Sequence, residues 1–288
     1  MDVNRQLKDS VFTFLFSNPD LLRELYCAIE GVTLPADIPV TINTLSDVLF
    51  MDKINDISFE IGGKLVIILE HQSTINPNMP LRLLLYIGRI YEKIIQDKKI
   101  YSSKKVFVPQ PEFFVLYNGL DPYPDEEVLK LSASFESTES LGLADKEKPS
   151  LELDVKVINI NAGKNEAIAK KCQTLAQYSA FITKVRECEK EGHSRQEAVK
   201  KAVIYCRSHD ILKEFLEQNA SEVMNMLITE WNWDDAKEVW QEEAREEGRE
   251  EGTQEERFRT AANLKKLEVS LEVIAQATGL PLEKIQQL

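Results

Sequence analysis

The feature that most constrains the fold is a pair of glycines, Gly62-Gly63, set between two runs of β-branched and bulky apolar residues. This pair predicts a hairpin turn, because glycine readily adopts the positive φ angles that tight hairpin turns require. The flanking runs predict two paired strands, residues 56–61 and 65–72. The chain is therefore expected to contain at least one antiparallel strand pair with alternating faces.

The register of this hairpin decides whether three polar residues come together. Side chains alternate along a strand, so Glu70 and Gln72 share one face. A two-residue turn would set Asp56 opposite Leu69, on the face away from Glu70. A three-residue turn would pair Asp56 with Glu70 on one face. We expect the three-residue turn, or an equivalent bulge.

Two carboxylates on neighbouring strands are a common way to hold a divalent cation. Hard oxygen ligands suit Mg²⁺, or Mn²⁺, and a cation so held can polarise a phosphate and activate water for phosphodiester hydrolysis. Asp56 and Glu70 are the candidate ligands, with Gln72 as a third catalytic residue. The alternative is that they are solvated acids at strand ends, which spacing alone does not exclude.

The first part of the chain mixes helices and strands. Residues 20–30 predict a short helix after Ser17-Asn18-Pro19, with Gly31 as its stop, and residues 11–16 predict a helical turn before it. Residues 34–41 contain two prolines and predict a loop, and residues 81–97 predict a helix. Residues 113–117 and 153–160 predict further strands.

After Asn161 the periodicity becomes helical, at residues 166–190, 195–206, 211–216 and 221–229. The expected organisation is an α/β domain over residues 1–162 and a helical region over 163–233. A charged Glu/Arg-rich helix over 234–259 and a small helical hairpin over 260–288, with a turn at Gly279 and a last helix from Pro281, are expected to follow.

The charge is segregated along the chain. Its net charge of −13 argues against a generic nucleic-acid binder, because affinity for phosphate backbones comes mainly from lysine and arginine. Yet residues 82–105 hold seven basic residues and two acids, 7 − 2 = +5, whereas residues 234–259 hold eleven acids and five basic residues, 5 − 11 = −6. Local balance therefore matters more than the sum.

The sequence gives no sign of export or of a membrane anchor. No apolar run approaches about 18 residues, and the N-terminus opens with a polar stretch. The four cysteines have no CxxC spacing, so neither a zinc site nor a disulfide framework is indicated. We expect a cytoplasmic protein with free thiols.

The residues around the hairpin resemble those of a known family. The matching stretches are Asn55-Asp56-Ile57-Ser58-Phe59 and the run from Leu69 to Arg82, LEHQSTINPNMPLR. Similarity continues at 7–9, Phe12, Phe16, 111–119, 274–275 and 278–280. On these residues the chain resembles the recombination-promoting nuclease family, whose bacterial members are also described as transposases of the PD-(D/E)XK class.

The resemblance implies a restriction-endonuclease-like core, a mixed sheet flanked by helices, with magnesium and cleavage of double-stranded DNA. It also implies a link to recombination, mobile elements or defence. This chain has Gln72 where the class signature has lysine. Glutamine can orient water by hydrogen bonds but brings no positive charge to the developing phosphorane.

A cation from elsewhere can replace that lysine. Arg82, Arg89 and Lys93 follow one stripe of the helix after the hairpin, with Arg82 favoured as the electrostatic helper and all three as DNA-binding candidates. A solvated helix face is the alternative. The class also uses an acid from an N-terminal helix, for which Glu24 and Asp9 are candidates.

Three functions are weighed. The first is a Mg²⁺-dependent DNA endonuclease. The second is a catalytically degenerate nuclease-fold protein whose helical C-terminal half mediates homo-oligomers or a partner contact, which the missing lysine and the acidic charge favour. The third, a helix-turn-helix DNA-binding module at the C-terminus, has few basic residues to support it. His71 faces away from Glu70 and is expected to pack in the core.

Overall fold

The computed structural model describes residues 10–43, 56–95, 100–101, 103–142, 148–267, 269–281 and 284, with the backbone alone at 56, 229–255 and 272. The chain divides into two compact units, residues 1–228 and residues 229–288. The boundary expected near residue 162 lies inside the first unit.

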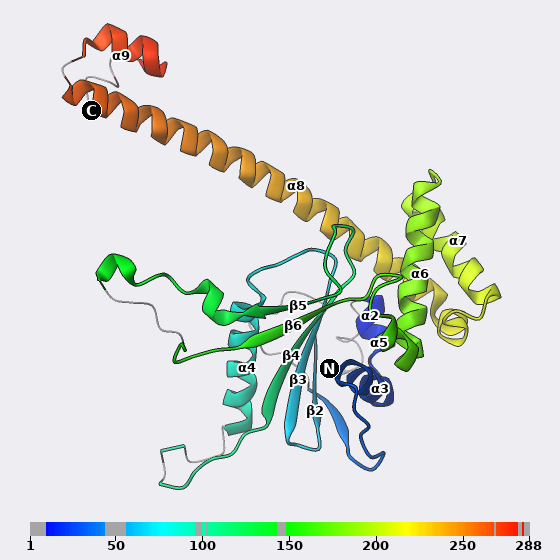
Figure 1. Ribbon diagram of the computed structural model, residues 1–288. Coiled ribbons are helices and arrows are strands. Elements are labelled where there is room, and N and C mark those ends of the chain that lie inside the picture. Colours follow the sequence, from blue (N-terminus) through cyan, green and yellow to red (C-terminus); the bar gives the residue numbers. More distant parts are fainter. Residues whose placement is uncertain are drawn as a thin grey trace. The chain divides into compact units, whose positions relative to one another are not determined.

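The first unit is built on a mixed six-stranded sheet with the order β1-β2-β3-β4-β6-β5 (Figure 1). Its strands are β1 (Val40–Asn43), β2 (Asp56–Ile61), β3 (Leu65–Gln72), β4 (Gln110–Tyr117), β5 (Glu126–Lys130) and β6 (Asp154–Asn159). The central strands β3, β4 and β6 are parallel, and β1, β2 and β5 pair antiparallel with their neighbours. The parallel centre places the carboxyl ends of three strands at one edge of the sheet.

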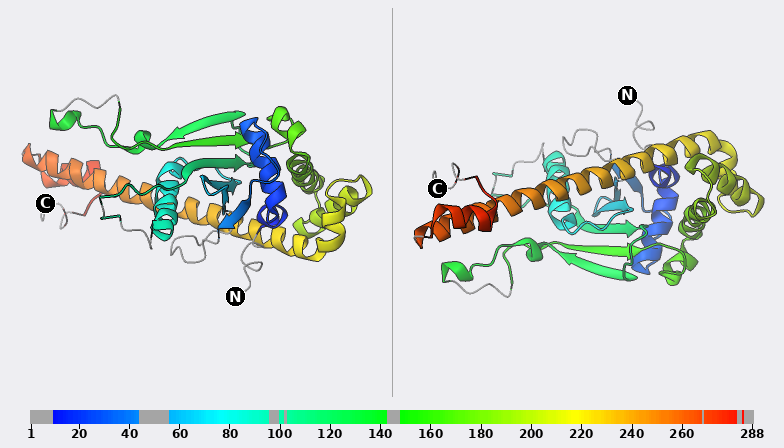
Figure 2. Two further views of the ribbon diagram at one scale, coloured as in Figure 1. Left: turned by 90° about the horizontal axis from the view of Figure 1, so that it is seen from below. Right: turned by 90° about the horizontal axis from the view of Figure 1, so that it is seen from above.

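Both faces of the sheet are covered by helices, as Figures 1 and 2 show. Helix α4 (Met79–Ile95) packs on one face, where Leu83 and Ile87 join the core with Val66 and Ile68 of β3. Helices α2 (Val11–Leu15), α3 (Pro19–Glu30) and α6 (Gln173–Lys190) lie on the other face. There the ring of Phe12 stacks on His71 of β3, with centroids 4.7 Å apart.

The helix ends follow local sequence signals. Asn18 caps α3 by accepting a hydrogen bond from the Asp20 amide at 2.8 Å, Pro19 occupies the first helical position, and Gly31 closes the helix with φ +67°. Ser10 and Thr13 form a capping box at the start of α2. The helices expected at 11–16 and 20–30 are confirmed.

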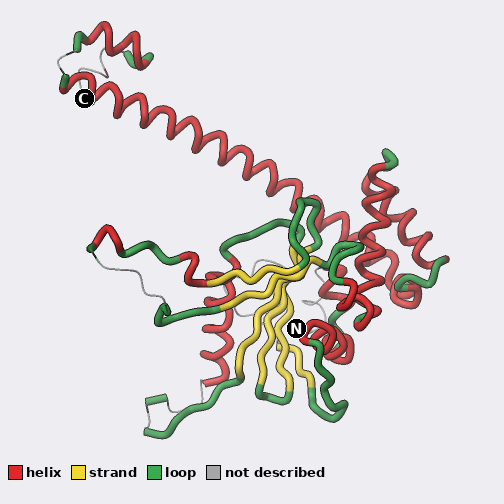
Figure 3. The backbone as a smooth tube through the Cα atoms, viewed as in Figure 1, coloured by secondary structure: helices red, strands yellow, loops and turns green. Residues whose placement is uncertain are grey.

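Two short 3₁₀ segments, η1 (Leu131–Ser134) and η2 (Glu139–Leu141), lie between β5 and β6. After β6 the regular elements are all helices in the part of the chain that the structure describes (Figure 3). They are α5 (Glu166–Lys171), α6, α7 (Arg195–Ser208), α8 (Lys213–Lys266) and α9 (Leu271–Thr278). The single helix expected over 166–190 is wrong, because Cys172 is extended, with φ −121°, and separates α5 from α6. The two helices expected at 211–216 and 221–229 are merged in α8, with a non-helical residue at Asn219.

The second unit contains the later part of α8 and helix α9. Ala261 of α8 and Ile274 of α9 are fully buried against each other, with apolar neighbours that include Leu264 and Leu271. The expected turn at Gly279 is confirmed by its φ of +72°. The helix expected from Pro281 falls mostly outside the described residues. The backbone of the expected charged helix, 234–259, is helical within α8.

Two strands were not expected from the sequence. Val40 and Thr41, placed in a loop because of Pro35 and Pro39, belong to β1 and pair with Ile61 and Glu60. β5 has three charged residues among its five and is mostly exposed. It is an edge strand, where charge is common and the alternation signal is weak. Within the described residues, no helix has a segment both long and apolar enough to cross a membrane.

The hairpin turn can be tested with two alanine substitutions in equally open surroundings. A methyl group added at Gly63 or at Gly88 of α4 would meet no atom within 4 Å. Gly63 has φ +63°, so we expect Gly63→Ala to lower the free energy of unfolding by about 1–2 kcal/mol. Gly88→Ala should raise it by up to about 1 kcal/mol. Urea unfolding measures both, and a neutral Gly63→Ala would contradict the left-handed turn.

Candidate functional site

The hairpin closes with the three-residue turn that brings Asp56 opposite Glu70. Ile61 pairs with Leu65, and this register continues to the Asp56–Glu70 pair. Gly62 and Gly63 have φ of +58° and +63°, and the Lys64 amide donates to the Ile61 carbonyl at 3.1 Å. The expected odd register is confirmed, so Asp56 and Glu70 belong to the same face of the sheet.

That face is the one covered by α4. Glu70 and Gln72 follow Val66 and Ile68 at period two, and all four are buried. Glu70 is only 3% exposed. Burial of a carboxylate in apolar surroundings is costly unless hydrogen bonds or an opposite charge compensate it. The neighbours of Glu70 therefore decide the chemistry of this end of β3.

Two donors meet one oxygen of the Glu70 carboxylate. The Gln72 amide nitrogen donates to Glu70 Oε1 at 2.6 Å, and Arg82 Nη1 lies 2.9 Å from the same atom. Arg82 also donates to the Tyr86 hydroxyl at 3.1 Å. The Gln72 amide nitrogen lies 2.8 Å from the sulfur of Met79, the first residue of α4. The start of α4 therefore places a positive charge beside Glu70 and Gln72.

The basic helix stripe does not act as a unit. Arg82 turns toward the sheet, with its side chain 24% exposed. Arg89 is exposed and pairs with Glu92 at 3.1 Å, and Lys93 is exposed in the last turn of the helix. Only Arg82 of the three lies beside Glu70, as its favoured role requires.

Glu24, one of the two candidate N-terminal acids, is not brought to Glu70. Glu24 belongs to α3, on the opposite face of the sheet, and its carboxylate accepts a hydrogen bond from the Gln173 amide at 3.1 Å, at the start of α6. Its role there is that of a helix-capping acceptor. Asp9 lies outside the described residues.

His71 faces away from Glu70, as expected, and is buried. Its ring stacks on Phe12, and its Nε2 lies 3.2 Å from the Tyr178 hydroxyl. Burial, aided by the positive charge of Arg186, lowers the pKa of His71 to about 3. His71 is therefore neutral in the folded protein at neutral pH.

The residue types at the hairpin suit a hard divalent cation. Two carboxylates on paired strands are ligands that Mg²⁺ and Mn²⁺ accept, and the neighbouring Gln72 amide can hydrogen-bond water. The backbone register places Asp56 beside Glu70, and a carboxylate that is already buried loses less hydration on binding a cation. Among the described side chains, no cluster of three His, Cys, Asp or Glu residues that could hold a metal ion is found.

Several polar residues at the carboxyl ends of β4 and β6 were not singled out from the sequence. Arg186 of α6 donates from Nη1 to the side-chain oxygens of Asn118 and Asn161, at 3.2 and 2.9 Å. Asn159 is buried at the end of β6. The Asn118-Gly119 pair indicated only a turn, and no local signal pairs Arg186 with a strand end 68 residues earlier.

Comparisons of this chain with models of protein families, with curated proteins and with solved structures found no match.

The Glu70–Arg82 pair can be tested by unfolding in EDTA. Arg82→Met would leave Glu70 buried without its cation, so we expect a loss of about 3 kcal/mol in the free energy of unfolding, at the low end because Arg82 is partly exposed. Adding Glu70→Gln should recover most of this loss. Arg89→Met, which breaks an exposed pair on the same helix, should cost less than about 0.5 kcal/mol. Equal losses for Arg82 and Arg89 would contradict the assignment.

His71 gives the stability a pH dependence. The unfolded chain binds a proton at this residue near the ordinary pKa of about 6.5, and the folded chain binds it only near pH 3. The stability that neutral His71 contributes is complete above about pH 6.5 and declines below it.

We expect His71→Phe to remove this dependence. The difference in unfolding free energy between the wild type and the variant should then change by about 2 kcal/mol from pH 7 to pH 5, with the wild type losing more. Urea titrations at fixed ionic strength measure the difference. A constant gap would mean that His71 is protonated equally in both states.

Proposed function

We propose that this chain is a Mg²⁺- or Mn²⁺-dependent endonuclease that hydrolyses phosphodiester bonds in double-stranded DNA. The observation that carries the proposal is the register of the hairpin, which pairs Asp56 with Glu70 and sets Gln72 two residues further along the same face. The same register would be expected of a PD-(D/E)XK core, and the mixed sheet with helices on both faces is compatible with one. Membership of the recombination-promoting nuclease family, and a role in recombination, mobile elements or defence, belong to the same proposal.

In this proposal each residue has a separate task. Asp56 and Glu70 hold the divalent ion, which when bound polarises the phosphate and lowers the pKa of water. Gln72 orients the attacking water through its side-chain amide. The water oxygen forms a new bond to phosphorus, the bond from phosphorus to the leaving sugar oxygen breaks, and that oxygen takes up a proton.

Arg82 supplies the positive charge that Gln72 lacks. A glutamine cannot stabilise the negative charge that develops on the phosphate, but the guanidinium of Arg82, 2.9 Å from Glu70, brings a positive charge to the same place. Its fork of donors also matches phosphate oxygens better than an ammonium group does. The missing lysine is therefore compatible with activity.

One observation favours a second candidate. The ion pair between Glu70 and Arg82, supported by Gln72, compensates the buried carboxylate without a metal. A protein that had lost catalysis and served as an interaction module, contacting a partner or another copy through its helical C-terminal half, would keep such a pair for structural reasons. The two candidates differ in what divalent ions do to them.

A plasmid-nicking assay tests the proposal. We expect the wild type to convert supercoiled plasmid to nicked or linear forms with Mg²⁺ or Mn²⁺ and not with EDTA. Asp56→Asn and Glu70→Gln should each lower the rate by at least about 100-fold, since both remove a ligand charge. Glu60→Gln is the matched control, an acid of β2 on the same face as Asp56, and should keep the wild-type rate.

The outcomes separate the candidates. Equal nicking by all four proteins would indicate a contaminating nuclease. Absence of nicking by the wild type, together with no heat of binding for Mn²⁺ in calorimetry, would favour the interaction module.

A further inference from the structure

A cleft of about 500 Å³ lies at the carboxyl ends of β4 and β6. Its walls include Gly119 and Tyr123 from the segment after β4, Asn161 and Lys164 from the segment after β6, and Arg186 and Lys190 of α6. The carboxyl ends of parallel strands are where α/β proteins commonly bind ligands. The cleft therefore lies where a ligand-binding site is expected.

Arg186 has an unusual set of partners. Its Nη1 donates to Asn118 Oδ1 at 3.2 Å and to Asn161 Oδ1 at 2.9 Å, and its Nη2 donates to the Asn118 carbonyl. All three acceptors are neutral, and among the described residues no carboxylate forms an ion pair with Arg186. Burial lowers the pKa of Arg186, and its charge helps to lower the pKa of His71. The positive charge is held in place and is not neutralised by an acid.

The guanidinium keeps one edge for a ligand. Arginine carries five N–H donors in a fixed plane. These three hydrogen bonds use both hydrogens of Nη1 and one of Nη2. The Nε hydrogen and the second Nη2 hydrogen remain, without an acceptor among the described residues. They share one edge of the guanidinium, the edge that binds two oxygens of a phosphate or carboxylate.

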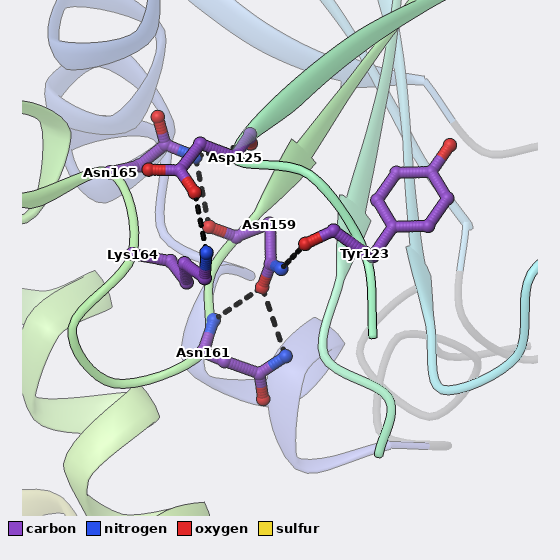
Figure 4. Close-up of polar contacts among 6 residues, drawn as sticks. All are labelled: Tyr123, Asp125, Asn159, Asn161, Lys164 and Asn165. Atoms are coloured by element: carbon purple, nitrogen blue, oxygen red, sulfur yellow. Dashed lines mark hydrogen bonds and ion pairs between the residues drawn. The ribbon is translucent and has the colours of Figure 1, made fainter. Parts of the chain in front are cut away.

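The asparagines around the cleft are held by hydrogen bonds, and Figure 4 shows those that join Asn161 to Asn159 and Asn159 to Tyr123. The Asn161 side-chain nitrogen donates to the Gly119 carbonyl at 3.1 Å and to Asn159 Oδ1 at 2.9 Å. Asn159 in turn donates to the Tyr123 carbonyl at 3.0 Å. Because its nitrogen is committed to these acceptors, Asn161 presents its oxygen to Arg186. The arginine is therefore set in a preorganised frame, which lowers the entropic cost of binding.

The charged groups that line the cleft leave a positive excess. Lys164 is paired with Asp125 at 2.7 Å, and Glu187 is paired with Lys184 at 3.0 Å. Of the remaining groups, Arg186 and Lys190 are cations and Asp121 is an acid. A local positive excess in a chain of net charge −13 points to an anionic ligand.

A hydrogen bond connects the wall of the cleft to β3, the strand that carries Glu70 and Gln72. The Asn118 amide donates to the Gln72 carbonyl at 2.8 Å, and the side chain of Asn118 holds Arg186. Gly119 packs so closely on the Ser73 carbonyl that a methyl group there would overlap it. Gln72 and Arg186 are thus joined through a single residue at the same edge of the sheet.

We propose that this cleft binds a backbone phosphate of the nucleic-acid strand, with Arg186 as the bidentate ligand and Lys190 as a second positive charge. This inference rests on the proposed function for its choice of ligand. It assigns DNA contact to residues of α6, whereas the sequence directed attention to Arg89 and Lys93 of α4. In this arrangement Arg186 positions the strand and takes no part in bond cleavage.

The test is DNA binding in EDTA, where no cleavage occurs, measured by the fluorescence anisotropy of a labelled duplex at several salt concentrations. We expect Arg186→Gln and Lys190→Gln each to weaken binding several-fold and to reduce the slope of log affinity against log salt by about 1. Lys200→Gln is the matched control, because Lys200 is exposed on α7 and lies outside the cleft. It should change neither quantity.

Lys190 is exposed, so Lys190→Gln decides the question if Arg186→Gln fails to fold. An unchanged affinity and salt slope for Lys190→Gln, or no DNA binding by the wild type, would overturn the proposal. Calorimetry with inorganic phosphate separates the sources. Phosphate binding that Arg186→Gln removes, with unaltered DNA affinity, would overturn the nucleic-acid assignment. DNA binding that is intact in the absence of nicking would contradict the proposed cleavage and would still support phosphate binding by the cleft.

Discussion

The buried carboxylate of Glu70 is the constraint on which the sheet depends. A charge that is only 3% exposed requires compensation, and here one carboxylate oxygen receives both Gln72 and Arg82. The hairpin register decides which residue of β2 lies beside this carboxylate. A slip of one residue would move Asp56 away from Glu70 and send the apolar residues of β2 to the wrong face. The glycine turn, through the strand pairing, and the start of α4 therefore both determine what surrounds this carboxylate.

The parts of the fold that follow from the sequence are those with local causes. The bounds of β2 and β3 were predicted because a positive-φ glycine turn and period-two alternation are both signalled by residues adjacent in the sequence. Helix α3 was predicted because its cap, its proline and its stop glycine lie within the helix or beside it. The break between α5 and α6 was not, because Glu24, the acceptor at the start of α6, lies 149 residues earlier.

The features of the candidate site also divide into those with local causes and those that depend on tertiary packing. Strand alternation predicted that Glu70 and Gln72 share a face and that His71 does not, and helical periodicity placed Arg82, Arg89 and Lys93 on one stripe. Which of those three turns inward depends on the packing of α4 against the sheet, which sequence spacing does not specify. Arg186 was missed because its partners are strand ends brought to α6 only by the parallel crossover.

Arg82 and Arg186 differ in whether their positive charge is offset by a neighbouring acid. Arg82 is paired with the Glu70 carboxylate, so its charge is offset at long range and acts only on groups directly beside it. Arg186 is held by amide and carbonyl oxygens, which fix its position without cancelling its charge. Neutral acceptors therefore preserve an attraction for anions that an ion pair would remove. In a chain with many more acids than bases, this arrangement concentrates positive potential at one edge of the sheet, where net composition gives no sign of it.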